Sequence, residues 1–370
     1  MPDVTAAAQR ISGDQHVAEA LRRGRGARSN RVSRFDNEQR TDFDDGWETL
    51  GTLDAFKTTV NEERAKSIIS SNDSPDLSFD QSINPYRGCE HGCIYCYARP
   101  THSYLGHSAG LDFETKLYAK VNAAELLERE LRNPRYQPKV IALGAVTDPY
   151  QPIERNFAIT RRILEVLDRT SHPVGIVTKS AGVVRDIDIL GRMAGRGLVK
   201  VAISVTTLDA KLARSMEPRA ATPPKRLEAI KRLSEVGIPV TVMVAPIIPA
   251  LNDNEIERIL DAAKAAGACE AGYVLLRLPL ELKELFREWL ETDFPDRSRR
   301  VINLLRSMHG GKDYVATFGH RQRGSGPSAE QIGGRFRLAM QRLGLERRGL
   351  RLRTDLFQRP AAPGAQLSLL

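Results

Sequence analysis

Three cysteines crowd into one short segment, and this feature restricts the fold and chemistry of the chain more than any other. Cys89, Cys93 and Cys96 follow C-x3-C-x2-C spacing, and Cys269 is the only other cysteine among 370 residues. Thiolates this close together on a loop can bind three corners of one iron–sulfur cluster. So few cysteines exclude the disulfide framework of a small secreted protein. The sequence therefore predicts a loop that binds a metal cluster.

Three thiolates leave one iron of a cubane cluster without a protein ligand, whereas electron-transfer clusters normally have four ligands. An open iron is a place for chemistry, as is the open position of a catalytic zinc. A zinc ion held by the three thiols and His91 is an alternative, although structural zinc sites usually take their ligands from two separated pairs. In a second alternative the cysteines are small buried hydrophobic residues, which the neighbouring Arg87 and Glu90 disfavour.

Short apolar runs alternate with segments of helical periodicity from about Ser82 onward. Strands are expected at residues 82–86, 116–121, 139–145, 174–178, 199–205, 239–246 and 272–277. Such alternation implies parallel strands joined by helical crossovers, wound as an open sheet or closed as a full or partial barrel. The fold class is therefore α/β.

The chain divides into three parts by composition. Residues 1–78 are polar and weakly periodic, which predicts an extension that wraps the domain or stays partly irregular. Residues 79–310 carry the α/β pattern, and residues 311–370 form a basic C-terminal extension. Within that extension, residues 319–326 are expected to form a mobile loop. Ser328-Ala-Glu-Gln331 has the pattern of a capping box, which predicts the start of a helix.

The charge of the chain admits two interpretations. Its net charge is +9, and residues 319–360 hold ten arginines against three acidic residues, interleaved with Phe336 and Phe357. This pattern could bind the phosphates of a nucleic acid, or it could be a solvated helical face with a basic tail. No run of about 18 apolar residues and no secretory signal is present, so we expect no membrane partner and a cytoplasmic protein.

The cysteine triplet, with Tyr95 before its last member and Tyr97 after it, resembles the signature of radical SAM enzymes. The resemblance implies a partial (β/α)6 barrel and a 4Fe–4S cluster on Cys89, Cys93 and Cys96, whose open iron chelates S-adenosylmethionine. It also implies reductive cleavage of that cofactor to a 5′-deoxyadenosyl radical, which abstracts hydrogen from a substrate. A reductant such as flavodoxin or ferredoxin would supply the electron.

Several further segments are similar to the branch of this superfamily that contains spore photoproduct lyase. These segments are Asn84-Pro-Tyr-Arg-Gly-Cys89, Cys96-Tyr-Ala-Arg99, Thr147-Asp-Pro-Tyr-Gln-Pro152, Thr178-Lys-Ser180 and Met216-Glu-Pro-Arg219. By this resemblance, Tyr95 and Tyr97 flank the cluster and cofactor. Lys179 and Ser204 would meet the polar groups of S-adenosylmethionine, and Ala245 would offer backbone to its adenine.

Other candidates lie near predicted strand ends, where the catalytic groups of barrel folds sit. Thr147 and Asp148 follow one such strand, and radical SAM proteins commonly use a small polar or acidic motif here to contact the amino group of the cofactor. A simple turn is the alternative for these two, and a solvated surface lysine is the alternative for Lys179. Glu217 and Arg219 are further cofactor candidates that could instead orient a loop, by pairing with each other or with a neighbouring helix.

One departure from the lyase pattern limits the functional prediction. Spore photoproduct lyases place a cysteine just before the Thr/Ser-Asp pair, whereas Gly144-Ala-Val-Thr-Asp148 contains no thiol. Cys269 lies at a predicted helix-to-strand junction, on the stabilising face of a βα unit, and is expected to fill the core. Spore photoproduct repair is therefore not expected. The remaining hypotheses are a radical SAM enzyme of unassigned substrate, with a nucleic-acid lyase or modifying enzyme as one version, and a non-enzymatic Fe–S sensor or structural module.

Overall fold

The main sheet of the protein is parallel and open. A computed structural model describes residues 22–31, 33–35, 57–345 and 351–361. Its strands follow the order β10-β9-β8-β7-β6-β3-β2, all parallel except β2, which pairs antiparallel with β3. The bounds are β2 (Ile69–Ser71), β3 (Gln81–Ile83), β6 (Ile141–Leu143), β7 (Val174–Thr178), β8 (Val199–Ser204), β9 (Val240–Ile247) and β10 (Glu270–Leu275). β2 and β10 are the two edges of this sheet among the described residues, so the sheet does not close into a full barrel, and the predicted α/β class is confirmed.

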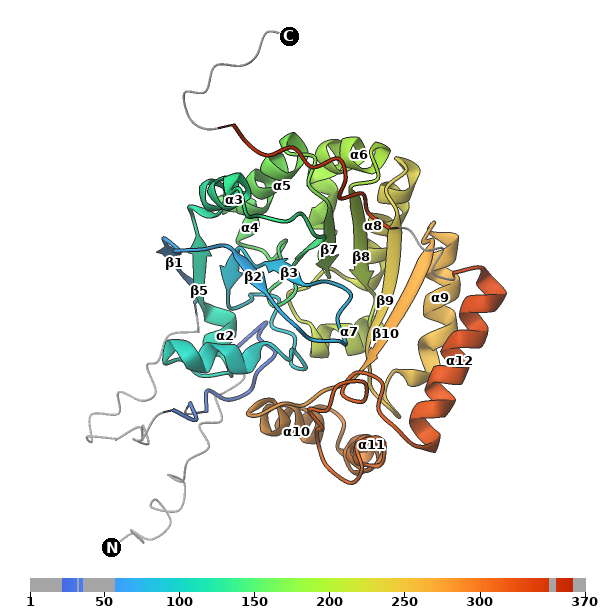
Figure 1. The fold of residues 1–370 in the computed structure, drawn as a ribbon. Coiled ribbons are helices and arrows are strands. Elements are labelled where there is room, and N and C mark those ends of the chain that lie inside the picture. The colour runs from blue at the N-terminus through green and yellow to red at the C-terminus, as the bar shows by residue number, and fades with distance from the viewer. Residues whose placement is uncertain (1–21, 32, 36–56, 346–350, 362–370) are drawn as a thin grey trace, which may run out of the picture.

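Helices connect the parallel strands and cover the outer face of the sheet (Figure 1). The main ones are α3 (Ala123–Arg132), α5 (Ile159–Arg169), α6 (Ile187–Gly195), α8 (Pro223–Glu235) and α9 (Ile256–Ala265). Shorter turns are η2 (Arg99–Leu105), α2 (Asp112–Thr115), α4 (Glu154–Phe157), η3 (Ala181–Asp186), α7 (Ala210–Met216) and η4 (Asp253–Glu255). This arrangement brings the carboxyl ends of all six parallel strands to one edge.

The core lies between the sheet and these helices. Leu143, Ile176, Ile203 and Val242 come from four neighbouring strands, and each is at most 1% exposed. They belong to one hydrophobic cluster with residues of the surrounding helices. Burial of this kind is typical of parallel strands, whose two faces are both covered. The rigid core therefore fixes the positions of the strand ends that carry the candidate site.

A second sheet corrects two of the predicted strands. It consists of β1 (Thr59–Glu63), β5 (Lys116–Lys120) and β4 (Tyr86–Arg87), in the order β1-β5-β4. The predicted strand at 82–86 is split into β3 and β4, because Pro85 between them has no N–H to donate to a ladder. The strand at 116–121 does form, but it pairs parallel with β1 and antiparallel with β4, outside the main sheet.

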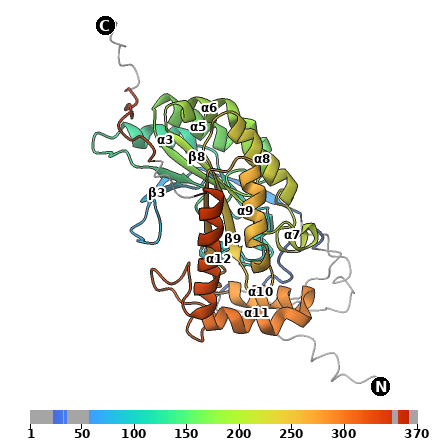
Figure 2. The same ribbon diagram turned by 90° about the vertical axis from the view of Figure 1, so that its right-hand side faces the viewer.

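The described residues after β10 include three helices, α10 (Leu282–Asp293), α11 (Pro295–Met308) and α12 (Pro327–Leu343). Figure 2 shows α12 beside α9. The predicted capping box is wrong: Gly326 is the N-cap and Pro327 opens the helix, so Ser328 already lies in the first turn. The loop expected to be mobile is anchored at Gly319, whose amide donates to Asp76 at 2.6 Å. Within the described residues, no helix is both long and apolar enough to cross a membrane.

Candidate active site

The three clustered cysteines lie on a loop that follows β4 and ends in η2. All three are free thiols; Cys89 and Cys93 are 7% exposed and Cys96 is half-buried. The loop turns back on itself at Gly88 and Gly92, with φ of +71° and +66°. A Cβ on Gly88 would lie 2.9 Å from the backbone oxygen of Phe113, so the close approach also requires glycine.

Burial controls the protonation of these thiols. It raises the pKa of Cys89 and of Cys93, and Lys179 opposes the change at Cys93. Such thiols stay protonated until a metal ion replaces the proton. Across the described ranges, no three His, Cys, Asp or Glu side chains lie close enough to hold a single ion. Thiols that bind three different irons of one cluster need not converge on one point.

Asp148 connects the cysteine loop to the end of β7. Its carboxylate lies 3.3 Å from Nδ1 of His91 and accepts hydrogen bonds from Thr178 Oγ1 and the Lys179 amide, both at 2.7 Å. Burial alone would raise the pKa of Asp148, but His91 and these hydrogen bonds outweigh it and lower the pKa to about 2. Thr147 contacts β4, the strand that precedes the cysteine loop: its hydroxyl donates a hydrogen bond to the Tyr86 carbonyl at 3.0 Å. Both residues thus do more than form a turn.

Glu217 lies at the centre of a buried polar network beside Tyr95. It accepts hydrogen bonds from the Tyr95 hydroxyl and, at 2.6 Å, from Thr206 Oγ1, and it forms an ion pair with Arg226 of α8. Glu217 therefore pairs with a neighbouring helix and not with Arg219. No local pattern in the sequence marks Thr206 or Arg226, which lie 11 and 9 residues from Glu217.

Lys179 lies above the ring of Tyr95, with Nζ 5.7 Å from the ring centroid. Lys179 lowers and Glu217 raises the pKa of the Cys93 thiol, and both residues contact Tyr95. In the described part of the chain, no carboxylate lies within ion-pair distance of the Lys179 ammonium. Arg219 instead pairs with Glu90 of the cysteine loop at 3.3 Å, which places it at the outer side of that loop.

Two of the three remaining candidates lie near the carboxyl ends of the next strands, and the third lies on the cysteine loop. Ser204 ends β8 and is 3% exposed; its carbonyl accepts from Arg226 Nη1 at 3.0 Å. Ala245 lies in β9, and its carbonyl accepts from Thr206 Oγ1 at 3.3 Å. Tyr97 is 44% exposed, and its hydroxyl donates to the Ala145 carbonyl.

Arg277 follows β10 and was missed by sequence reasoning. Its guanidinium carbon lies 4.4 Å from the centroid of the Tyr97 ring. The exposed Tyr97 ring and the half-buried Arg277 thus stack on each other at the carboxyl edge of the sheet. Arg277 lies 180 residues after Tyr97 in the chain and has no motif of its own, so only the fold brings the two together.

Cys269 corrects an expectation. It lies at the start of β10, as expected, but it is exposed and its thiol donates to the Val240 carbonyl at 3.3 Å. The core role is wrong because alternation along the chain turns Ala268 and Glu270 inward and Cys269 outward. Cys269 therefore differs in exposure from the clustered cysteines, which are buried or half-buried.

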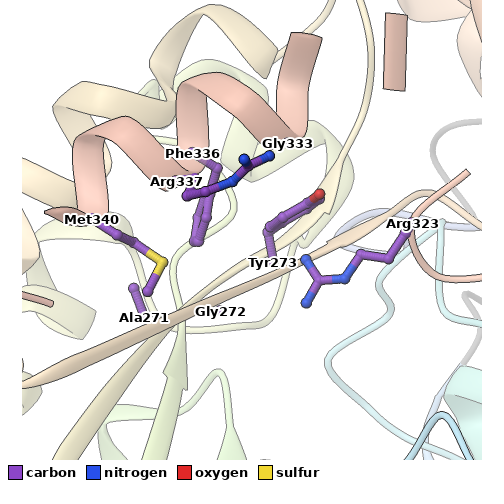
Figure 3. Close-up of a pocket in the computed structure, with 8 residues that line it drawn as sticks. All are labelled: Ala271, Gly272, Tyr273, Arg323, Gly333, Phe336, Arg337 and Met340. Atoms are coloured by element: carbon purple, nitrogen blue, oxygen red, sulfur yellow. The ribbon is translucent and has the colours of Figure 1, made fainter. Parts of the chain in front are cut away.

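The basic C-terminal region differs from the expected binding surface. Phe336 is 3% exposed and packs on Tyr273 of β10, with ring centroids 4.6 Å apart (Figure 3). Arg323 and Arg337 line the same cavity of about 250 Å³. Four other arginines form ion pairs: Arg321 with Asp76, Arg335 with Glu257, Arg342 with Asp261 and Arg353 with Asp355. The interleaving of Phe336 is therefore a packing pattern, and its ring is not available to stack on bases.

Known proteins resemble this chain in sequence and in fold. A family model described as the Radical SAM superfamily matches residues 83–263. An uncharacterised protein of Mycobacterium tuberculosis is 37% identical over 232 residues, covering 62% of this chain and 68% of the relative. An uncharacterised protein of Methanocaldococcus jannaschii is 28% identical, covering 67% of this chain and 88% of the relative.

A solved structure of spore photoproduct lyase, complexed with dinucleoside spore photoproduct, aligns with a TM-score of 0.57. The alignment covers 77% of this chain and 79% of that chain at 15% identity, so it establishes a shared fold. The cysteine triplet, the parallel sheet and the family match agree with one another. The chain belongs to the radical SAM superfamily and is a radical SAM enzyme.

Proposed function

We propose that the chain binds a 4Fe–4S cluster through Cys89, Cys93 and Cys96 and uses it to cleave S-adenosylmethionine reductively. The observation that carries this proposal is the loop of free, largely buried thiols, whose His91 and Tyr95 contact the strand-end residues Asp148 and Lys179. When bound, the cluster supplies one electron to the sulfonium, which yields a 5′-deoxyadenosyl radical for hydrogen abstraction. Three thiols leave the fourth iron open to the cofactor.

Lys179 and Ser204 are our proposed contacts for the polar groups of the cofactor. The Lys179 ammonium lacks a carboxylate partner within the described residues, so it can bind the cofactor's carboxylate. Ser204 lies at the carboxyl end of β8, where it would face the same cofactor. The backbone near Ala245 would face the adenine. Thr147 would help to form this edge of the site through its contact with β4.

Three charged candidates receive positioning roles. The Asp148 carboxylate contacts His91 of the cysteine loop and accepts a hydrogen bond from the Lys179 amide at the end of β7. It would therefore hold the cysteine loop against the sheet. Glu217 would fix the Tyr95 ring through its hydroxyl, and Arg219 would hold the loop through Glu90. A buried carboxylate with satisfied partners is well suited to such a role.

Tyr97 is our candidate for returning a hydrogen atom after the substrate radical has reacted. The Tyr95 hydroxyl is taken up by buried Glu217, whereas Tyr97 is exposed and donates to Ala145, in the stretch that lacks a thiol. Transfer of its phenolic hydrogen atom would leave a tyrosyl radical, which the external reductant would restore together with a proton. We propose flavodoxin or ferredoxin as that reductant.

The direct test is anaerobic reconstitution with iron and sulfide, reduction by dithionite, and chromatographic detection of 5′-deoxyadenosine. We expect formation from S-adenosylmethionine, its loss in Cys93→Ala and its retention in Cys269→Ala, because Cys269 is outside the cysteine loop. A cluster that is visibly reduced while S-adenosylmethionine stays intact would overturn the proposal and favour the Fe–S sensor or structural module.

A nucleic acid is a second candidate, as the substrate. Tyr97 and Phe318 are exposed, and each carries an arginine over its ring, Arg277 at 4.4 Å and Arg321 at 4.7 Å. Exposed aromatic rings beside cations are suited to stacking bases and binding phosphates. We expect single-stranded oligonucleotides to bind with steep salt dependence, weakened by Arg277→Gln and not by Arg353→Gln. Binding that is absent or insensitive to salt would exclude this candidate.

A further inference from the structure

The N-terminal segment at residues 22–31 lies against the cysteine loop and contributes to its structure (Figure 1). We infer that this segment is part of the cluster-binding site: Gly26 and Ala27 clamp the loop through Glu114 and Arg99, and this clamp governs how firmly the cluster is retained. The inference rests on the proposed cluster on that loop. It assigns a function to a part of the chain that lies outside the region matched by the family model.

Glu114 is the hub of the clamp and is fully buried in α2. Its Oε2 accepts a hydrogen bond from the Gly26 amide at 2.9 Å, and its Oε1 accepts one from the Ala27 amide at 2.7 Å. Arg99 Nη2 completes the set at 2.5 Å from Oε1. One carboxylate therefore joins the N-terminal segment to the arginine that follows the cysteines, through three charge-assisted hydrogen bonds.

Arg99 carries the connection into the cysteine loop. Its Nε donates to the Cys93 carbonyl at 2.9 Å, and its Nη2 donates to the Gly92 carbonyl at 3.1 Å. Its Nη1 donates to the Gly110 carbonyl at 2.9 Å. The side chain has no exposure to solvent, so these bonds form in a low-dielectric surrounding where they are strong. They fix the backbone that presents Cys93.

Shape complementarity adds to these hydrogen bonds. A Cβ on Gly26 would lie 1.8 Å from the Gly92 carbonyl oxygen, and a Cβ on Gly110 would lie 2.1 Å from the Ser29 oxygen. Ala27 is fully buried in the same hydrophobic cluster as Cys93. Only glycine at position 26 allows the segment to approach the loop this closely. The segment therefore covers one side of Cys93.

The outer side of the segment is also held. Arg28 pairs with Asp293 at 2.6 Å, and Ser29 donates to Glu288 at 2.7 Å, so the segment lies between the cysteine loop and α10. Residues that orient metal ligands commonly change metal affinity by about 10- to 100-fold. Water access and local charge also set the reduction potential of an iron–sulfur cluster. Loss of the clamp should therefore affect retention and spectrum together.

The test compares iron release from the reconstituted full-length chain and its variants into a ferrous chelator, together with the electron paramagnetic resonance spectrum of the reduced cluster. Glu114→Gln removes the charge of the hub, and exposed Glu125→Gln is its matched control. Gly26→Ala displaces the segment without changing charge. Gly191→Ala is its control, because no atom lies within 4 Å of a Cβ there.

We expect both clamp variants to release iron on the order of ten-fold faster than the parent and to shift the spectrum, with both controls unchanged. Circular dichroism identifies a variant that fails to fold. The inference is then tested on the clamp variant that does fold. Release and spectra equal to the parent in a folded clamp variant would overturn the inference. A parent chain that takes up no cluster would instead contradict the proposed function.

Discussion

The protein has two arginine-rich regions that look alike in sequence and differ in structure. In the N-terminal segment at residues 22–31, Arg22, Arg25 and Arg28 are buried beside the cysteine loop. In residues 319–360, Arg342 and Arg353 form exposed ion pairs, Arg335 pairs with α9 at a half-buried position, and only Arg321 among the described ion-paired arginines is largely buried, against Asp76 of the β2–β3 connection. Charge density therefore does not reveal function; the burial of the charges separates a structural clamp from a solvated surface.

The largest expected effect on stability comes from breaking the buried ion pair between Arg99 and Glu114. Arg99→Met should lower the free energy of unfolding by about 4 kcal/mol, because it leaves Glu114 charged and buried without its cation. Urea denaturation measures the change. If Arg99→Met cost no more than Arg342→Met, whose ion pair with Asp261 is exposed, the distinction between the two regions would fail.

The next effect tests whether the C-terminal region is anchored by packing and not by charge. Phe336→Ala should cost about 3 kcal/mol of unfolding free energy, because it opens a cavity between α12 and β10. Leu338→Ala on the exposed face of the same helix is the control and should change little. Equal effects in thermal or urea unfolding would mean that α12 is not packed on the core.

The pH dependence of stability tests the contact between the C-terminal tail and the core, where His172 packs against Phe357. His172 is buried against Tyr136 and Phe357, and burial lowers its pKa to about 4. A histidine with a lowered pKa stabilises the fold fully above its ordinary pKa of about 6.5, and this stability is lost as pH falls toward 4.

The parent should therefore lose about 2 kcal/mol of unfolding free energy from this residue between pH 7 and pH 5. The loss should be absent in His172→Gln and present in His320→Gln, because His320 is exposed. Urea denaturation at the two pH values measures it. An identical pH dependence in the parent and in His172→Gln would show that His172 is not buried in its neutral form.

The smallest effect is expected from the outer ion pairs. Arg342→Gln should change the free energy of unfolding by less than about 1 kcal/mol, because both partners are exposed and water screens their attraction. Salt titration of the parent and the variant separates the charge from packing. A loss of several kcal/mol would place this arginine in the same class as Arg99 and remove the contrast between the two regions.

The sequence was informative where the pattern is local. The predicted strand at 174–178 coincides with β7, and the cysteine spacing led directly to the superfamily. The placement of Lys179 after β7 also follows from the alternation of strand and helix. These features depend on residues that are neighbours in the chain, so periodicity and spacing detect them.

Features that depend on contacts between distant segments were not predictable. Glu114 meets Gly26 across 88 residues, and Arg99 meets Gly110 only because η2 turns back. Likewise, the exposure of Cys269 is decided by the phase of its strand and not by its residue type. Nothing in local composition distinguishes a buried arginine from a solvated one before the fold brings their partners together.

The most direct test of the central claim is electron paramagnetic resonance of the reduced, reconstituted protein with and without S-adenosylmethionine. Three cysteine ligands leave one iron open. We therefore predict that the cofactor changes the spectrum of the parent and that Lys179→Met, which removes the proposed contact, weakens the concentration dependence of that change. A reduced cluster whose spectrum is unaffected by saturating S-adenosylmethionine would contradict the claim that this cluster binds and cleaves the cofactor.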